Sequence, residues 1–431
     1  FMSSVSIYEM DCWGQPYRDA ALSAHAEAEL SVPLSVVQEC LLPGGRLVWG
    51  SPVASGDNLV IACSKPVSGF GAELTSADEI YCFSMHSGEC KWTFKTAIPS
   101  GFSPLVSGNR VLVPGETLGC LDIENGKLLW EIYLKADFMP TLDGEIAYII
   151  ASEQEDASEP FPGIYVVQIQ NGEFRKIEPE ILCEFGGFVT VSDNTLCLPY
   201  SSGAESGILA LNSQTGEIIW KRTESPVRLC HQKIILHDEG ILYLVDRSAE
   251  LLALNRETGE LLWAFGENLF LLGSLSADDS HIYCYSKSTG TIFCLDKKTG
   301  NLVWQSDSIF PDESKKAIID EKSLISSKNL IFVCQHRCQD RKWYDFSESY
   351  IYALDNNMGT LVWTSRPFSS PPGPLAICGD FLIASSGSKI FVFEGSGENL
   401  RRGIEKSFVC FGAGITVFVV IIILLRKKYE K

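Results

Sequence analysis

The chain has 431 residues, and its 45% hydrophobic content is enough to bury a large core. Its formal net charge of −19 argues against nucleic acid as a partner, because binding phosphate requires clustered lysine and arginine. The 15 cysteines include no adjacent pair, and few are spaced as metal ligands, so we expect mostly reduced, buried thiols and not a disulfide framework.

Residues 1–43 match nothing later in the chain. We expect this N-terminal extension to be poorly structured, with at most a short helix over residues 16–30. It contains no apolar stretch that resembles a signal peptide. The extension therefore adds little to the assignment of fold or compartment.

One short pattern recurs from residue 45 onwards. The stretch ALNRETGELLW at residues 253–263 shows it: a strand ends, a tight turn closes at a glycine, and a second strand ends in tryptophan. Glycine supplies the positive φ that other residues resist in such a turn. The turn glycine recurs at Gly45, Gly88, Gly126, Gly172, Gly216, Gly259, Gly300 and Gly359. Four residues after these glycines stand Trp49, Trp92, Trp130, Trp220, Trp263, Trp304 and Trp363, and Lys176 replaces the tryptophan once.

A second polar turn lies between successive copies of this pattern. Asp143-Gly144 and Glu239-Gly240 are examples, and each precedes a short apolar run that is typical of a strand. Each period of about 43 residues therefore holds four short strands, as a propeller blade does. Counting the turns predicts an all-β, eight-bladed β-propeller, with seven blades as the alternative.

The two ends of the repeat region predict how the ring closes. Gly45–Trp49 has the sequence of a final strand with no matching partner before it. Ile390–Phe393 has the sequence of a third strand whose expected follow-on degenerates into Gly395-Ser396-Gly397. We therefore expect the N-terminal strand to complete the last blade, which would remove open strand edges that invite aggregation.

The propeller is predicted to span residues 44–396, followed by a polar tether at residues 397–406. Two insertions interrupt the repeats: an acidic, proline-containing loop at residues 153–162 and the segment at residues 311–349. Insertions on a rigid ring often carry binding specificity. The alternative interpretation is that both insertions are solvated surface loops without a binding role.

Residues 407–425 (SFVCFGAGITVFVVIIILL) carry no charge, and these 19 residues, at about 1.5 Å each, nearly cross a hydrocarbon core of about 30 Å. We therefore expect a single transmembrane helix, followed by a basic tail at residues 426–431. The tail is slightly more basic than the near flank, which predicts a cytoplasmic tail and an extracytoplasmic propeller. The free cysteines and the lack of any Asn-x-Ser/Thr acceptor site favour the alternative, a tail-anchored ring in the cytosol.

The hairpin motif resembles the PQQ-type β-propeller repeat: Ala or Cys, an apolar residue, Asp or Asn, then Thr-Gly and, four residues after the glycine, Trp. Ala210–Trp220 and Ala253–Trp263 match it at every position, with Asn and not Asp at the third. Cys294–Trp304 matches with Cys for Ala, and Ala353–Trp363 has Met358 for Thr. The resemblance covers roughly residues 45–395. It implies that the repeat tryptophans dock between neighbouring blades, so these tryptophans and turn glycines are structural residues.

The family includes quinoprotein dehydrogenases as well as proteins without a cofactor, such as BamB-like outer-membrane assembly lipoproteins and luminal sensor domains. The dehydrogenases resemble one another in an adjacent cysteine pair, a calcium site and an aspartate base. This chain has no adjacent cysteines and no segment that maps onto that site. Cys334–Cys338 (CQHRC) offers three potential zinc ligands but no second pair of cysteines is evident. We therefore expect no catalytic residue, no cofactor and no metal site.

The whole sequence predicts a membrane-anchored, non-enzymatic β-propeller that serves as a protein-binding platform or assembly factor. Its partners would be proteins bound on a propeller face or on its loops, and the membrane through residues 407–425. One alternative is a quinoprotein dehydrogenase that uses PQQ and calcium. The other is a ligand-sensing ectodomain that signals through a partner in the membrane.

Overall fold

The computed structural model of the chain describes residues 12–16, 19, 23–65, 76–99, 102–153, 162–181, 183–202, 205–224, 234–236, 240–246, 248–309, 317–319, 324–338, 346–370 and 372–395. Within these ranges, no helix has the length and apolar character needed to cross a membrane. The span expected at residues 407–425 lies outside them.

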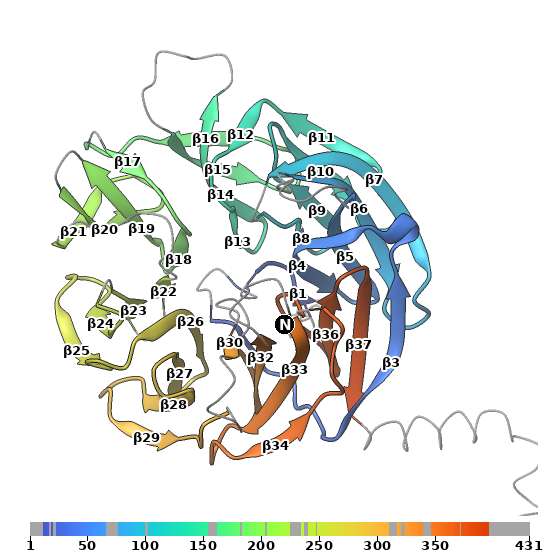
Figure 1. Ribbon diagram of the computed structural model, residues 1–431. Coiled ribbons are helices and arrows are strands. Elements are labelled where there is room, and N and C mark those ends of the chain that lie inside the picture. The colour runs from blue at the N-terminus through green and yellow to red at the C-terminus, as the bar shows by residue number, and fades with distance from the viewer. Residues whose placement is uncertain are drawn as a thin grey trace, which may run out of the picture.

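The described strands pair in eight sheets, and the sheets are arranged as blades around a closed ring (Figure 1). The predicted all-β, eight-bladed propeller is therefore confirmed.

Blade 1 contains β4 (Leu47–Ser55), β5 (Asn58–Ser64), β6 (Ser76–Ser84) and β7 (Cys90–Pro99), with β1 (Cys12–Trp13) beside β4. Blade 2 contains β8 (Leu105–Ser107), β9 (Arg110–Val113), β10 (Leu118–Asp122) and β11 (Leu128–Ile132). Blade 3 contains β12 (Leu134–Ala136), β13 (Thr141–Asp143), β14 (Ile146–Glu153), β15 (Gly163–Gln168) and β16 (Phe174–Ile177).

The next three blades follow in chain order. Blade 4 contains β17 (Glu184–Phe185), β18 (Thr190–Ser192), β19 (Thr195–Ser202), β20 (Glu205–Asn212) and β21 (Ile218–Glu224). Blade 5 contains β22 (Ile234–Leu236), β23 (Ile241–Val245), β24 (Leu251–Asn255) and β25 (Leu261–Phe265). Blade 6 contains β26 (Leu271–Ala277), β27 (His281–Ser286), β28 (Thr291–Asp296) and β29 (Leu302–Gln305).

The last two blades incorporate strands from the N-terminal region. Blade 7 contains β30 (Ala317–Ile319), β31 (Ile325–Ser327), β32 (Leu330–Cys338), β33 (Phe346–Asp355) and β34 (Leu361–Thr364), with β2 (His25–Ala26) parallel to β31. Blade 8 contains β35 (Ala376–Cys378), β36 (Phe381–Ser386), β37 (Lys389–Gly395) and β3 (Leu34–Leu41).

The middle strands form the core. Every residue of β5 is buried, and so is every residue of β36. A middle strand has neighbours on both edges and packs against adjacent blades on both faces, so its sequence is a continuous apolar run with little alternation. The short runs that the sequence marks as strands are of this kind.

Strand β3 closes the ring. It pairs antiparallel with β37 from Leu34 opposite Gly395 to Leu41 opposite Lys389 (Figure 1). An N-terminal strand thus completes the last blade, as expected, but the strand is not the one that the sequence suggested. The expected segment lies in β4 of blade 1, where Trp49 pairs with Ala62. Residues 34–41 are thus a strand of the ring, and Trp49 lies in β4 and not in the outer strand, where the other repeat tryptophans lie.

Five tryptophans join neighbouring blades through one repeated contact. Each indole N–H donates a hydrogen bond to the backbone carbonyl three residues before the turn glycine of the next blade. The pairs are Trp92 with Ile123 (2.6 Å), Trp130 with Ile169 (2.8 Å), Trp220 with Arg256 (2.5 Å), Trp263 with Lys297 (3.0 Å) and Trp304 with Asn356 (2.9 Å). The turn glycine lies against the indole: a Cβ on Gly300 would be 2.6 Å from Cδ2 of Trp263. The same glycine has φ of +70°, so both its conformation and its contact exclude a side chain.

A β-bulge directs each of these tryptophans toward the next blade. Trp263 pairs with Ala253 and Leu261 pairs with Leu254, so Leu262 is an extra residue in the outer strand. The outer strands of blades 1, 2, 4, 6 and 7 have the same shift. Blade 3, which carries Lys176 in place of tryptophan, has a continuous register over this stretch. The tryptophan and the bulge are therefore lost together.

Strand β3 reproduces this arrangement although it comes from the other end of the chain. Its register shifts between Val36 and Gln38, which makes Val37 the extra residue. Gln38 then stands in the tryptophan position, and its side chain lies against Gly88 of blade 1. Gln38 is thus the eighth member of the interblade series, with an amide in place of an indole.

The residue opposite each tryptophan is small and fully buried. Cys82, Cys120, Ala210, Ala253, Cys294 and Ala353 hold this position. Among the described residues, eleven cysteines are free and ten of these are buried. Burial raises the pKa of the Cys197 thiol to about 12. The expectation of buried, unpaired thiols is confirmed for the cysteines that the structure describes.

The closure predicts the effect of removing β3. Deleting residues 1–41 should leave the backbone groups of β37 unpaired at an open edge. We expect a lower melting temperature and concentration-dependent oligomers in size-exclusion chromatography with light scattering. Deleting residues 1–11 alone, which retains β1, β2 and β3, is the control. A monomer with unchanged melting after the longer deletion would contradict the closing role of β3.

The glycine contact predicts a difference between two Gly→Ala substitutions. Gly144→Ala introduces only a left-handed alanine, because φ is +57° and nothing lies within 4 Å of the new Cβ; the cost should be about 1–2 kcal/mol. Gly300→Ala adds the clash with Trp263, which should cost about 1–3 kcal/mol more. Urea unfolding of both variants checks this, and equal losses would show that the indole contact is not tightly packed.

Candidate functional site

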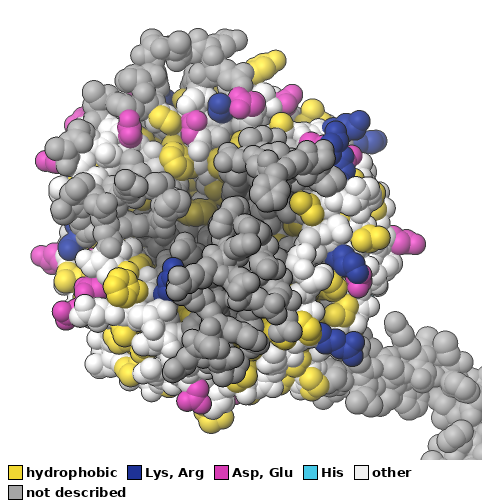
Figure 2. Space-filling view, in the orientation of Figure 1, with side chains coloured by type: hydrophobic (Ala, Val, Ile, Leu, Met, Phe, Trp, Pro, Cys, Tyr) yellow, Lys and Arg dark blue, Asp and Glu magenta, His cyan; other side chains and the backbone are white. Residues whose placement is uncertain are grey.

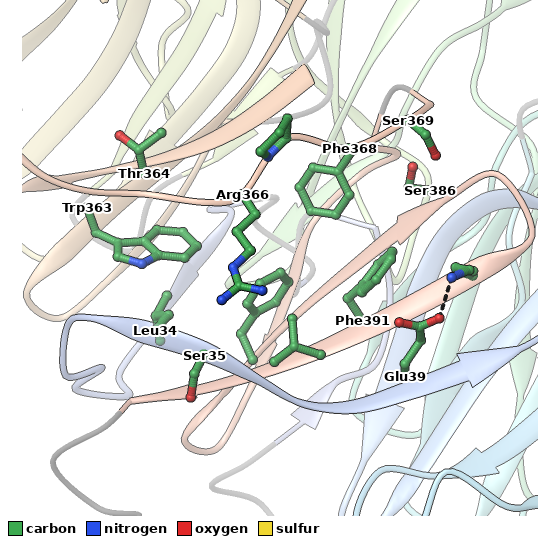
Figure 3. Close-up of a pocket in the computed structure, with 14 residues that line it drawn as sticks. Leu34, Ser35, Glu39, Trp363, Thr364, Arg366, Phe368, Ser369, Ser386 and Phe391 are labelled. Atoms are coloured by element: carbon green, nitrogen blue, oxygen red, sulfur yellow. Dashed lines mark ion pairs between the residues drawn. The ribbon is translucent and has the colours of Figure 1, made fainter. Parts of the chain in front are cut away.

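The junction between blades 7 and 8 lacks the turn that fills the equivalent space elsewhere. Strands β37 and β3 come from opposite ends of the chain, so no hairpin turn joins them. Trp363 of β34 therefore faces no turn glycine, and no hydrogen bond from its indole N–H is found to any described residue. A groove of about 710 Å³ opens here instead, lined by residues of β3, β34, β36 and β37 and of the segment after β34 (Figure 3).

Aromatic side chains form the walls of this groove, which we call the seam groove. The ring centres of Trp363 and Phe393 are 5.9 Å apart with an interplanar angle of 79°. Those of Phe368 and Phe391 are 5.2 Å apart at 77°. Such edge-to-face pairs hold each other in place, so the groove has stiff apolar walls.

Arg366 supplies positive charge to the groove. Figure 3 shows its side chain between Trp363 and Phe368, directed toward β3. No carboxylate of the described residues forms an ion pair with it. The other basic group, Lys389, is 2.5 Å from a carboxylate oxygen of Glu39 and is thereby neutralised. In a chain of net charge −19, a guanidinium that pairs with no carboxylate of the described residues favours an anionic ligand.

A smaller cavity of about 230 Å³ lies where turns of blades 6 and 7 meet the N-terminal segment. His25 lines it, and its Nδ1 is 2.8 Å from Oγ of Ser326. Asp278 also lines it: it accepts hydrogen bonds from the Tyr283 hydroxyl at 2.6 Å and from the amide of His281 at 2.7 Å. His25 and Asp278 thus both have hydrogen-bond partners within the fold.

The electrostatics of Asp278 reflect these contacts. Burial by itself raises the pKa of Asp278, but the hydrogen bonds from the Tyr283 hydroxyl and from the amides of Ser280 and His281 offset burial and hold the pKa below its usual range. Burial raises the pKa of Tyr283 strongly, with the adjacent carboxylate adding to the effect. The pair is thus a partly buried carboxylate bound by a neutral phenol, which stabilises the turn.

Other predicted sites lie only in part within the described chain. Cys334 is buried at 0% exposure within the core of blades 7 and 8, while the side chains of residues 335–338 are outside the described set. Of the two predicted insertions, the one at residues 153–162 lies outside it except for its two end residues. The segment at residues 311–349 supplies β30, β31, β32 and the start of β33, and only residues 311–316, 320–323 and 339–345 of it lie outside. Across the residues that the structure does describe, no group of three or more His, Cys, Asp or Glu side chains could hold a metal ion.

The rim of the ring carries a repeated apolar feature. Leu261 and Leu262, the two residues before Trp263, are 48% and 47% exposed. Five other outer strands carry equivalent exposed pairs: Val36-Val37, Leu128-Leu129, Ile218-Ile219, Leu302-Val303 and Leu361-Val362. Figure 2 shows hydrophobic side chains spaced around the circumference between charged ones. Strand alternation predicts that one residue of each pair is buried, whereas the bulge leaves both exposed.

The seam groove could not be located from the repeat motif. It joins Leu34, Val36 and Glu39 with residues 363–393, which no local pattern connects. The one available signal was the degenerate sequence after Phe393, where the last hairpin turn should have been. That signal identifies the irregular blade but not the aromatic groove beside it.

A family model described as outer membrane protein assembly factor BamB, of the PQQ-like type, matches residues 35–177 and 204–338. These stretches make up more than half of the chain, and the chain therefore belongs to this PQQ-like β-propeller family. The predicted resemblance is confirmed. No curated protein sequence matches the chain.

Solved structures of similar fold include two enzymes and a designed protein. The chain is 12% identical to a quinohemoprotein alcohol dehydrogenase, ADHIIG, from Pseudomonas putida HK5, covering 90% of this chain and 81% of that one with a TM-score of 0.62. It is 11% identical to the quinohemoprotein alcohol dehydrogenase of Comamonas testosteroni, covering 89% and 80% with a TM-score of 0.60. The computationally designed Ika8 protein is 14% identical, with 82% and 98% covered and a TM-score of 0.58. At these identities the likeness shows the fold alone.

The low pKa of Asp278 predicts how stability depends on pH. A carboxyl whose folded pKa lies below its unfolded value of about 3.9 stabilises the fold above that pH and loses the effect as pH falls through the folded pKa. Asp278→Asn should therefore lower the unfolding free energy at pH 7 by about 1–3 kcal/mol, and the difference should shrink toward pH 2. Urea unfolding across this range measures it.

Asp279→Asn is the matched control, because Asp279 lines the same cavity but its side chain is exposed. We expect this variant to retain the stability of the original protein at pH 7. A gap between Asp278→Asn and the original protein that stays constant from pH 7 to pH 2 would contradict the assignment.

Proposed function

We propose that this protein is a membrane-anchored β-propeller that binds a protein partner and has no catalytic activity of its own. The observation that carries the proposal is the seam groove, which has stiff aromatic walls and an arginine with no acidic partner among the described residues. These are features of a recognition site. The match to a family model described as an assembly factor supports the same role.

The exposed apolar pairs on the rim also support a binding role. Scattered apolar side chains on a surface need no explanation, but here they recur at the same two positions of six outer strands. A ring with a repeated apolar rim offers a partner several equivalent contacts. We assign the main recognition to the seam groove, because there a repeat tryptophan is present and the turn that it binds elsewhere is missing.

Residues 407–425 are the proposed anchor, with the propeller on the extracytoplasmic side. The uncharged sequence and its basic flanks support this arrangement. The cysteines, which by themselves favour a reducing compartment, are compatible with it, because ten of the eleven described are buried. A buried thiol with a raised pKa forms little thiolate and oxidises slowly.

Topology provides the first test. We expect protease added to intact cells or sealed right-side-out vesicles to reach the propeller and leave the tail at residues 426–431 protected. An epitope tag at each end and immunoblotting measure this. Protection of the ring, with an accessible tail, would place the propeller on the other side and overturn this part of the proposal.

Cofactor chemistry provides the second test. After incubation with PQQ and calcium, the purified protein should show no bound quinone absorbance and no dye-linked oxidation of alcohols or sugars. A quinoprotein dehydrogenase known to be active serves as the control. Quinone binding with turnover would establish the dehydrogenase alternative and overturn the non-enzymatic assignment.

A further inference from the structure

The five filled junctions show what a repeat tryptophan binds. In each, the indole N–H donates to a backbone carbonyl three residues before a turn glycine, over 2.5–3.0 Å. The glycine lies against the indole, as Gly126 does on Trp92. In four of the five, an Asp or Asn side chain holds the turn, such as that of Asp122, which accepts hydrogen bonds from the amides of Glu124 and Asn125. The ligand of this position is therefore a glycine-containing turn.

The junction between blades 7 and 8 is the sixth that has a repeat tryptophan. Here the tryptophan, Trp363, has no turn of the next blade to bind. Trp363 pairs with Ala353 through the same bulge as the other tryptophans, so its indole has the same position on its strand. The seam groove occupies the place of the missing turn, and its volume of about 710 Å³ falls in the range of about 300–1,000 Å³ for ligand sites. The junction is thus preformed for a turn that the described chain does not supply.

The charges select which turn fits. The groove offers two kinds of donor: the indole N–H of Trp363 and the guanidinium of Arg366. A backbone carbonyl suits the first, and a carboxylate suits the second, because arginine binds carboxylates through paired, charge-assisted hydrogen bonds. Glu124 stands two residues before Gly126 in the blade 2 turn, which shows that a turn of this shape accommodates an acidic side chain.

We propose that the seam groove binds an acidic, glycine-containing β-turn of a partner protein, with its carbonyl on Trp363 and its carboxylate on Arg366. This inference rests on the proposed protein-binding function and names the chemistry of the partner. The partner completes the interblade contact that the ring leaves unfinished. Binding would also brace the junction where the two ends of the propeller meet.

A turn peptide provides the direct test. The probe is a fluorescein-labelled peptide that copies residues 121–128 (LDIENGKL), cyclised through added terminal cysteines, and binding to the full chain is measured by fluorescence anisotropy. Arg366→Glu should weaken binding by at least about tenfold, as expected for losing a charge-assisted hydrogen bond. Trp363→Phe should weaken it by about fivefold, because the indole donor is lost and the aromatic surface is kept.

Matched controls separate this contact from general effects. Trp304→Phe removes the same donor at a filled junction, and Lys287→Glu reverses an exposed charge away from the groove; both should leave peptide affinity unchanged. In the probe, alanine in place of the glycine, or glutamine in place of the glutamate, should reduce affinity for the original protein. Thermal melting of each variant confirms that it is folded.

Three outcomes would overturn the inference. The probe fails to bind the original protein, or it binds the Arg366→Glu and Trp363→Phe variants equally well. Alternatively, replacing residues 396–400 with five serines strengthens binding, which would show that this segment of the chain occupies the groove itself. None of these outcomes bears on the topology and quinone tests, so failure here and failure of the proposed function are distinguishable.

Discussion

The contact between an indole and the turn of the next blade is the interaction on which the ring depends. It explains four features of the repeat at once. The glycine is required because its Cα lies against the ring, and the small residue opposite the tryptophan leaves room for it. The bulge orients the indole, and the turn carbonyl accepts its N–H. Blade 3 shows the coupling, because it lacks both the tryptophan and the bulge.

A ring made from an open chain has one blade whose outer strands are not joined by a hairpin. In this protein that blade is the eighth, and its outer strand β3 comes from the N-terminal region. Toward blade 1 the interblade contact is rebuilt with Gln38 in place of tryptophan. Toward blade 7 it is not rebuilt, and the seam groove results. The irregular part of the molecule therefore follows from the topology of closure.

The fold and the function have separate origins here. The repeat residues that define the family make and dock the blades, so family membership and a shared propeller fold do not decide between binding and catalysis. Within the seam groove, Trp363 and Arg366 are donors for which the described residues provide no hydrogen-bond or ion-pair partner. They lie where the repeat ends, and their chemistry suits a polypeptide ligand with an acidic group.

The sequence by itself predicted the class of fold, eight blades with seven as the alternative, and every turn glycine except Gly45, because these features depend on contacts within one repeat of neighbouring strands. Only the tertiary structure decided that Leu34–Leu41 closes the ring and that Trp49 lies in an inner strand. It also decided which side chains surround the seam groove. These features depend on pairing between segments that are far apart in the chain. A local repeat pattern does not show which distant strand pairs with the open edge of the last blade.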